Sequence, residues 1–551
     1  MHENMSDTTV EKKTEEPAVH PRAYTNDSQD EEVGIVDRAG GKLHTDLKSR
    51  HMQMIAIGGA IGAGLFIGSG SALYKGGPAP LVIGYLIVGI MLLFTMQALA
   101  ELAVLYPVNG AFYTYVVRFV DPSWGFAMGW DYAIAWLTVL PFELIAAGIT
   151  IQFWRPDLNV AIWVTVFLVI LTLIQIFGVR GYGEVEFVLS MIKIAACIGF
   201  IILGIVIDCG GVGNQGYLGA KYWYDPGAFK NGFNGFAGVF VVAAFAFGGT
   251  ELVGLAAAET ANPRKAIPKA SKQVFFRIAF FYIINLFILG LILPNTDERL
   301  ASASGANSSY SPFVLAIQDA GISVLPSIFN AVITVSVISV ANSCTFGSTR
   351  TMQAMAERGM APKFLAYVDK AGRPIWCVAV QLAFGLLGYV GVAADGLDVF
   401  NWLLALSGLS YFFVWGSCCL AHIRFRMAWK QQGRSLREIP YRTPLGIWGS
   451  VIGLFLNIIC LIATFYNALY PTPDATPDAA TFFQAYLAAP IAVVLYLFWK
   501  TWSGDWRRMW VKLGDIDLNA GARPLEMEDE DEIMDKKTLG NLPMRIVRAL
   551  F

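Results

Sequence analysis

The chain has 551 residues, of which 55% are hydrophobic and only 15% are charged. Soluble globular proteins carry about a quarter charged residues, so this composition excludes an ordinary soluble protein. The formal net charge is −2, which offers none of the basic surface that nucleic-acid binding requires. Residues 1–50 hold 18 of the 82 charges, and the middle of the chain is strongly apolar. We therefore expect a membrane protein that binds the lipid bilayer and no nucleic acid.

Apolar stretches long enough to cross a membrane recur along the whole chain. A helix needs roughly 20 apolar residues to span a hydrocarbon core of about 30 Å. Inside lipid the backbone must satisfy its own hydrogen bonds, which favours helices over strands. We predict an all-α polytopic membrane protein with twelve transmembrane helices at residues 52–73, 81–105, 123–153, 161–178, 185–207, 234–257, 275–294, 322–349, 375–394, 399–420, 445–470 and 483–502.

The basic residues predict the orientation of these spans. Loops on the side of the two chain ends hold 24 Lys and Arg residues, and loops on the opposite side hold 5. Cytoplasmic loops collect Lys and Arg, so both termini are expected in the cytoplasm. The polar, acidic N-terminus has no charged segment followed by an apolar core, so we expect no cleaved signal peptide. The seven Cys residues form no CxxC pair, and no disulfide framework, metal site or cofactor is expected.

Both ends of the chain are polar and acidic. Residues 1–40 and the run EMEDEDEIMD at 526–535 are typical of disordered segments. The plainer interpretation is two solvated tails without chemistry. The alternative is regulation, in which ubiquitylation machinery is a candidate partner, at Lys12, Lys13, Lys536 and Lys537.

The first and sixth spans are poor continuous helices. Span one reads IAIGGAIGAGLFIGSG, and span six, VVAAFAFGGTELVGL, has Gly248 and Gly249 at its centre. Each interior Gly costs a helix roughly 1 kcal/mol relative to Ala. One interpretation is close helix packing through Gly58 and Gly62. The other is local unwinding that turns the amides of residues 62–64 inward, where a carboxylate could bind. Paired breaks in the first and sixth spans are the pattern of transporters built from inverted repeats.

Few ionisable residues remain inside the spans, and each must find a partner or line a cavity. These residues are Asp131, Glu143, Lys193 and Glu251, while the five His residues lie in tails or at interfaces. If protons drive transport, the titrating group is then a carboxylate or a buried lysine, because burial disfavours a charge. A purely structural pair between Glu143 and Lys193 remains the alternative. Glu259 is expected to pair with Arg264 or Lys265, or to form a cytoplasmic gate.

Four motifs together resemble the fungal amino-acid permease family of the amino acid, polyamine and organocation superfamily. They are GGAIGAGLFIGSG, FAFGGTELVGLAAAETANPRKAIPKA, NSCTFGSTRTMQAMAERGMAP and HIRFR, and the match covers roughly residues 45 to 505 in order. The run TELVGLAAAE is most similar to general, broad-range permeases. The resemblance implies a five-plus-five inverted-repeat core of the LeuT type with two added helices. The corresponding segments are 1–50 (tail), 51–230 and 231–425 (the two repeats), 426–502 (a loop and the last two helices) and 503–551 (tail).

The resemblance also implies a substrate site. It places the substrate carboxylate at Ile61 to Gly64, the amine at carbonyls from Phe245 to Gly248, and an aromatic lid at Phe245. It assigns proton coupling to Lys193 and Glu143, and it assigns the preference among substrate side chains to Ser407. The candidate substrate-binding residues are Ala60, Ile61, Gly62, Ala63, Gly64, Glu143, Phe245, Ala246, Phe247, Gly248, Gly249, Glu251, Asn342 and Ser407.

Three departures from the family pattern affect these expectations. Ala63 stands where many members have Thr, which removes a hydroxyl near the carboxylate. Asp131 stands where a neutral residue is expected, and its role stays open. The chain ends at Phe551 without a terminal Cys, so C-terminal lipidation is not implied.

These observations together predict a symporter, not an enzyme, that imports L-amino acids with protons across the plasma membrane by alternating access. The range is expected to be broad and mainly neutral. The nearest alternative is a narrow permease for basic amino acids or proline, since Glu143 could meet a cationic side chain. A non-transporting amino-acid sensor is a second alternative, although a cytoplasmic tail of about fifty residues is short for signalling. A membrane enzyme would need a catalytic cluster, which the sequence does not display.

Overall fold

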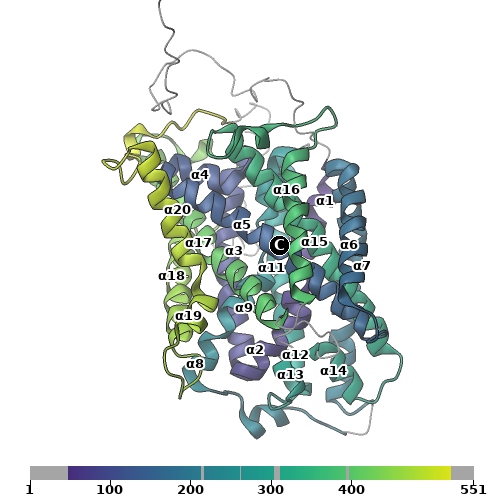
Figure 1. Ribbon diagram of the computed structural model, residues 1–551. Coiled ribbons are helices and arrows are strands. Elements are labelled where there is room, and N and C mark those ends of the chain that lie inside the picture. Colours follow the sequence, from purple (N-terminus) through teal and green to yellow (C-terminus); the bar gives the residue numbers. More distant parts are fainter. Residues whose placement is uncertain (1–46, 213–215, 261, 303–310, 393–395, 523–551) are drawn as a thin grey trace, which may run out of the picture.

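The computed structural model describes residues 47–212, 216–260, 262–302, 311–392 and 396–522 (Figure 1). Within these ranges the chain is helical, and its one β-bridge joins Leu47 to Thr260. The expected disorder at residues 1–40 and 526–535, and the four candidate lysines in the tails, lie outside the described residues.

Eight helical segments are long and apolar enough to cross a membrane, and each coincides with an expected span. They are α3 (Pro78–Leu105), α5 (Pro122–Gln152), α7 (Gly178–Asp208), the run Gly232–Glu259, the run Pro263–Ile292, α15 (Leu325–Glu357), Asn401–Gln431 within α17 (Gly396–Gln431), and α18 (Ile447–Leu469). The run Gly232–Glu259 consists of α8 (Gly232–Ala237), α9 (Val239–Phe247), α10 (Leu252–Leu255) and a final 3₁₀ turn. The run Pro263–Ile292 consists of α11 (Pro263–Phe276), the π-helical η4 (Arg277–Ile284) and α12 (Asn285–Ile292).

The other four expected spans are helical but shorter, broken or bent. Span one is divided into α1 (Ser49–Gly58), the π-helical η1 (Gly64–Gly68) and α2 (Ser69–Gly76). Spans four and nine are α6 (Val160–Ile176) and α16 (Ile375–Gly385), the latter extended by the 3₁₀ turn η7 (Leu386–Val392). Span twelve is α19 (Ala479–Tyr486) and α20 (Ala488–Ser503), which meet at 68°. Pro490 lies at this bend and has no N–H to donate to the preceding turn.

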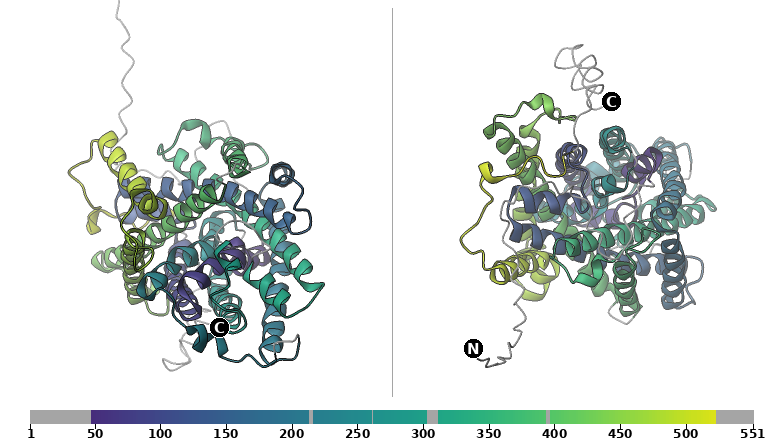
Figure 2. Two further views of the ribbon diagram at one scale, coloured as in Figure 1. Left: turned by 60° about the horizontal axis from the view of Figure 1, so that its bottom comes forward. Right: turned by 90° about the horizontal axis from the view of Figure 1, so that it is seen from above.

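The long helices form one bundle around a buried centre. The helices α3, α5, α9, α11 and α15 lie in the middle, with α6 and α7 on one side and α18 to α20 on the other (Figure 1). In both further views the last helices, coloured yellow-green, lie at the edge of the bundle (Figure 2). The helix α5 packs along α15, and α1 packs against α7. This arrangement puts the interrupted first and sixth spans at the centre, surrounded by protein.

Residues 504–522 pack against the helices that end on their side of the bundle. The hydroxyl of Tyr106 donates to the carbonyl of Leu518 at 2.8 Å, and Arg118 of α4 (Ala111–Phe119) donates to the carbonyl of Ala520 at 2.7 Å. Ile516 and Leu518 are buried. The beginning of the C-terminal tail is therefore part of the folded molecule.

Candidate functional site

The helix of span one is interrupted at the expected glycines. The helix α1 ends at Gly58, and regular hydrogen bonding resumes where the amides of Leu65 and Phe66 donate to the carbonyl of Gly62 at 3.2 and 3.1 Å. Ile61 and Ala63, inside the interruption, are buried. The interruption therefore brings a stretch of backbone from Ala60 to Gly64 into the centre of the protein.

Span six has a matching interruption. The helix α9 ends at Phe247, and Gly248 leaves the helical region with a ψ of 141°. Gly249 has a φ of +96°, a conformation that favours glycine because it has no Cβ. Helical structure resumes at Leu252. The pair Gly248-Gly249 is thus the point at which the chain can turn out of one half-helix and into the next.

The two interruptions contact each other through their backbones. A Cβ added at Gly64 would lie 2.5 Å from the Cα of Ala246, so only glycine allows this approach. Tyr282, on η4, has its hydroxyl 3.1 Å from the carbonyl of Ala60 and 2.7 Å from the carbonyl of Ala246. Its ring stacks on Phe247 with centroids 4.4 Å apart. Tyr282 thus joins the two broken spans, and sequence reasoning did not identify it.

Glu251 braces the break in span six. Its Oε1 accepts hydrogen bonds from the hydroxyl of Tyr132 at 3.0 Å and from the amide of Gly249 at 3.2 Å. Its Oε2 accepts one from the indole N–H of Trp415 at 3.3 Å. The carboxylate is therefore occupied by groups from α5, α17 and its own loop.

Glu143 lies beside the break in span one and is less well satisfied. A Cβ added at Gly62 would be 3.8 Å from the Oε1 of Glu143. Both carboxylate oxygens are buried, and neither has a hydrogen-bond partner among the described residues. A buried carboxylate without a donor is costly, which makes it a strong candidate for binding a cationic or hydrogen-bonding group.

Phe245 lies at the end of the first half of span six. Its ring contacts Phe142, the residue before Glu143, edge to face with centroids 4.8 Å apart. Only 6% of Phe245 is exposed. A Cβ added at Gly408 would be 3.5 Å from the Cβ of Phe245, so α17 packs against span six at this point. The hydroxyl of Ser407 donates to the carbonyls of Leu403 and Leu404 within its own helix.

Two further buried polar residues lie apart from these contacts. The Oδ1 of Asn342 accepts a hydrogen bond from Gln175 of α6 at 3.3 Å, and its Nδ2 has no partner among the described residues. The Oδ1 of Asp131 accepts from the hydroxyl of Ser410 at 3.1 Å, which ties α5 to α17. The structure thus gives Asp131 a position between two long helices.

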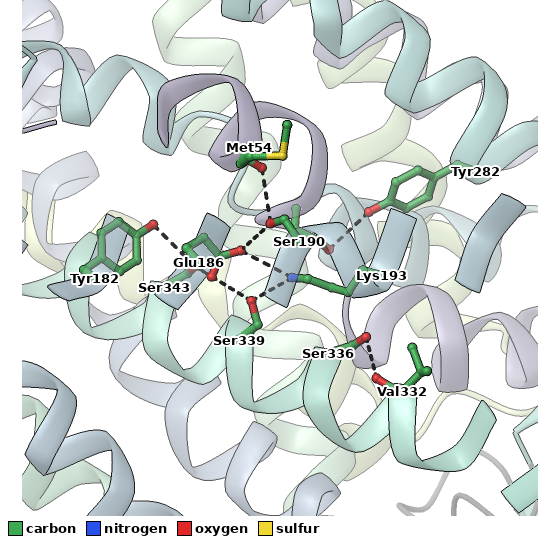
Figure 3. Close-up of polar contacts among 11 residues, drawn as sticks. Met54, Tyr182, Glu186, Ser190, Lys193, Tyr282, Val332, Ser336, Ser339 and Ser343 are labelled. Atoms are coloured by element: carbon green, nitrogen blue, oxygen red, sulfur yellow. Dashed lines mark hydrogen bonds and ion pairs between the residues drawn. The ribbon is translucent and has the colours of Figure 1, made fainter. Parts of the chain in front are cut away.

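Lys193 is the centre of a buried polar cluster (Figure 3). Its Nζ lies 3.4 Å from the Oε1 of Glu186 and donates to the hydroxyl of Ser339 on α15 at 2.8 Å. The hydroxyl of Ser339 donates to the Oε2 of Glu186 at 2.6 Å, and that of Ser190 donates to Oε1 at 3.0 Å. Ser190 also lies 3.4 Å from the carbonyl of Met54 on α1. The cluster therefore connects α1, α7 and α15.

Sequence reasoning missed Glu186. The expected span began at residue 185, which put Glu186 at the membrane interface, but α7 begins at Gly178 and carries Glu186 two turns inside. Glu186 and Lys193 are seven residues apart, a spacing that puts both on one helix face. That spacing is the signal that could have identified the pair. Neither oxygen of Glu143 hydrogen-bonds to Lys193, whose carboxylate partner is Glu186, so the structural pair between Glu143 and Lys193 considered from the sequence is not formed.

A second buried ion pair closes the end of span six. The guanidinium of Arg350 on α15 donates to both oxygens of Glu259, at 2.8 and 3.0 Å. Sequence reasoning considered Arg264 and Lys265 and did not consider Arg350, which is 91 residues away in the chain. The amide of Leu47 donates to the carbonyl of Glu259 at 3.2 Å, so the entry to span one meets the same point.

Comparison with known proteins agrees with this architecture. The family model of the amino acid permeases matches residues 51–512. The chain belongs to the amino acid permease family. It is 49% identical to the general amino-acid permease GAP2 of Candida albicans, over 94% of this chain and 88% of the relative. It is 47% identical to the general amino-acid permease GAP1 of Saccharomyces cerevisiae, over 93% and 86%. Cationic amino acid transporter 1 of Schizosaccharomyces pombe is 50% identical, over 90% and 84%.

The fold of this permease is shared with a solved transporter. A manganese transporter from Eremococcus coleocola superposes with a TM-score of 0.54, over 85% of this chain and 98% of that chain, at 12% identity. At that identity the likeness concerns the fold alone. Family and fold together identify the protein as a multi-pass membrane transporter and not as an enzyme.

Proposed function

We propose that this permease is a proton-coupled symporter that imports L-amino acids, mainly neutral ones over a broad range, by alternating access. The observation that carries the proposal is the meeting of two interrupted spans, at which Tyr282 lies within hydrogen-bond distance of both Ala60 and Ala246. Unwound backbone at the centre of a bundle can offer amides to a carboxylate, and carbonyls, each of which can accept a second hydrogen bond, to an amine. That pair of groups is common to every amino acid.

In this proposal the substrate carboxylate binds at Ile61 to Gly64, and the amine binds at carbonyls from Phe245 to Gly248. Phe245 closes over the substrate, with Phe142 as its contact on α5. Ser407, next to Gly408 in α17, is the residue proposed to set the preference for the substrate side chain. Ala63 offers a methyl group and no hydroxyl, which suits a site of broad range.

Proton coupling is assigned to the cluster around Lys193, with Glu143 as the second candidate. When Lys193 is protonated, its ammonium pairs with Glu186 and holds α7 against α15. Loss of that proton leaves Glu186 as an unpaired buried carboxylate, which weakens the cluster that joins α7 to α15 through Ser339 and to α1 through Ser190. A charge that crosses a potential of 100 mV gains about 2.3 kcal/mol, so an accompanying proton is an adequate driving force.

The same proposal includes the membrane topology. Twelve spans, arranged as two five-helix repeats and two added helices, account for the matching interruptions in spans one and six. The excess of Lys and Arg on one side supports a cytoplasmic position for both termini in a protein of the plasma membrane.

A competition panel tests the substrate range. Cells that lack other amino-acid permeases and express this chain take up one labelled neutral amino acid, challenged by each of the twenty amino acids at two pH values. We expect many neutral amino acids to compete and uptake to rise at the lower pH. Competition by only lysine and arginine, or by only proline, would replace the broad range with a narrow one.

A carrier for basic amino acids is the alternative that a specific observation favours. The carboxylate of Glu143 has no hydrogen-bond partner among the described residues and lies beside the break in span one. It could pair with a cationic substrate side chain, and one relative is a cationic amino acid transporter. Glu143→Gln separates the two cases, because it would abolish basic but not neutral competition in a carrier that uses Glu143 for the side chain.

A further inference from the structure

A cavity of about 430 Å³ lies outside the broken spans, between α17, α18, α20 and the start of α5. Pockets of this size hold small ligands in many proteins. Its walls are largely apolar and include Trp124, Phe412, Leu461 and Tyr496. The wall is open to the outside of the bundle, since Ile458, which lines it, is 46% exposed. Because α18 and α20, which form its outer side, lie at the edge of the bundle (Figure 1), we expect this opening to face lipid.

The polar groups that line the cavity are mostly used by the protein. Asp121 pairs with Lys500 at 3.1 Å, and the hydroxyl of Ser417 accepts a hydrogen bond from the indole of Trp124 at 2.8 Å. The Nδ2 of Asn457 donates to the carbonyl of Gly453 at 2.8 Å, while its Oδ1 has no partner among the described residues. The chemistry of the walls therefore suits a hydrocarbon chain and not an amino acid.

One end of the cavity is formed by a basic and aromatic segment. Residues 506–512 read WRRMWVK and follow the last helix after Gly504 and Asp505, and Met509 and Trp510 line the cavity. Trp510 is 54% exposed, and Arg507, Arg508 and Lys512 are exposed beside it. Exposed tryptophans next to a span are typical of the membrane interface, and basic clusters there attract anionic lipid head groups.

We propose that this cavity binds one anionic glycerophospholipid, with an acyl chain along α17 and α18 and the phosphate at Arg507, Arg508 and Lys512. Met509 and Trp510 join the apolar walls to the segment that carries the three exposed cations, and such a lipid likewise joins an apolar chain to an anionic head group. The site is separate from the broken spans, so it does not depend on which substrate the permease carries. The bound lipid fills the space between α18 and the core helices α5 and α17.

Lipid retention by the purified full-length protein tests the proposal. Native mass spectrometry counts the phospholipids retained after exchange with equal amounts of dioleoyl phosphatidylglycerol and dioleoyl phosphatidylcholine. We expect one retained phosphatidylglycerol and a preference of roughly tenfold over phosphatidylcholine, because three exposed cations meet the phosphate. Equal retention of the two lipids, or retention of neither, would overturn the proposal.

A variant whose side chain fills the cavity tests whether the lipid binds there. A Cβ at Gly416 would meet Asn457 and Leu454 at ordinary distances of 3.4 to 3.7 Å, so Gly416→Leu extends into the cavity without a backbone clash. Gly199→Leu is the matched control, because Gly199 lies on the exposed face of α7 with nothing within 4 Å of an added Cβ. We expect Gly416→Leu to lose the retained lipid and Gly199→Leu to keep it. Retention by both variants would show that the lipid binds elsewhere.

Two further experiments test the head-group assignment and the chemical class of the bound lipid. The triple variant Arg507→Gln, Arg508→Gln, Lys512→Gln should lose the preference for phosphatidylglycerol, and an unchanged preference would contradict the head-group assignment even if Gly416→Leu failed to fold. Displacement of the phospholipid by ergosterol in the wild type would replace the proposal with a sterol site.

Discussion

The side-chain nitrogen of Lys193 lies 3.4 Å from a carboxylate oxygen of Glu186, two turns earlier on the same helix, and both side chains are fully buried. Desolvation of such a pair costs several kcal/mol per ion, and the cost is recovered only when further hydrogen bonds satisfy both groups. Ser190 and Ser339 supply those bonds here. The pair thus lies where α1, α7 and α15 meet, and a change in its charge would alter the hydrogen bonds among all three helices.

The stability of the Lys193–Glu186 pair is testable by a double-mutant cycle. Removal of one member leaves the other as an uncompensated buried charge, so Lys193→Met and Glu186→Gln should each lower stability by about 3–5 kcal/mol. The double variant should recover part of that loss, because no buried charge remains. Thermal unfolding of the purified protein measures the three effects. Losses that simply add would show that the two side chains do not interact.

Coupling to the proton gradient should depend on Lys193. In vesicles with an imposed pH gradient, we expect Lys193→Met to transport a labelled neutral amino acid only down its own gradient. The wild-type protein should accumulate it. Ser336→Ala, on the same stretch of α15 but bonded to its own backbone at Val332, is the control that should keep accumulation. Acid-stimulated accumulation that survives in Lys193→Met would move the proton carrier to Glu143.

Phe245 should act as the lid of the substrate site. Phe245→Ala removes the ring that packs on Phe142, so the occluded state loses contacts, and uptake should fall at low substrate concentration. Phe245→Tyr keeps a ring of similar size and should retain more of the activity. Concentration curves for several labelled amino acids provide the measurement. Identical curves for wild type and Phe245→Ala would remove Phe245 from the site.

Tyr282 should hold the two broken spans in place. Tyr282→Phe removes only the hydroxyl near the carbonyls of Ala60 and Ala246, and an unsatisfied buried polar group costs about 1–3 kcal/mol. We expect lower thermal stability and weaker substrate binding. Tyr441→Phe is the matched control, since the hydroxyl of Tyr441 donates to Gln97 instead. Equal substrate affinity in the two variants would show that Tyr282 does not position the site.

Composition and hydropathy were sufficient to predict an all-helical membrane protein, because hydrocarbon leaves a chain few other ways to satisfy its backbone. Eight expected spans coincide with long apolar helices. The motif at Gly248-Gly249 predicted the break in span six, since a φ of +96° strongly favours glycine. Helix ends were harder to place. The helix α7 begins at Gly178, seven residues before the expected start of the span, and the late expected start is why Glu186 was not recognised as a residue inside the span.

What the sequence determined by itself is local: which segments are apolar, where glycine interrupts a helix, and which charges lie within the spans. Those properties act between near neighbours in the chain. Which charge meets which partner was decided only by the tertiary structure. Lys193 joins Glu186 and Ser339, Glu259 joins Arg350, and Tyr282 reaches both Ala60 and Ala246. Apart from Lys193 and Glu186, which share one helix, these contacts join residues 36 to 222 positions apart. They exist because buried polar groups must be satisfied by whatever the packing of the helices brings within reach.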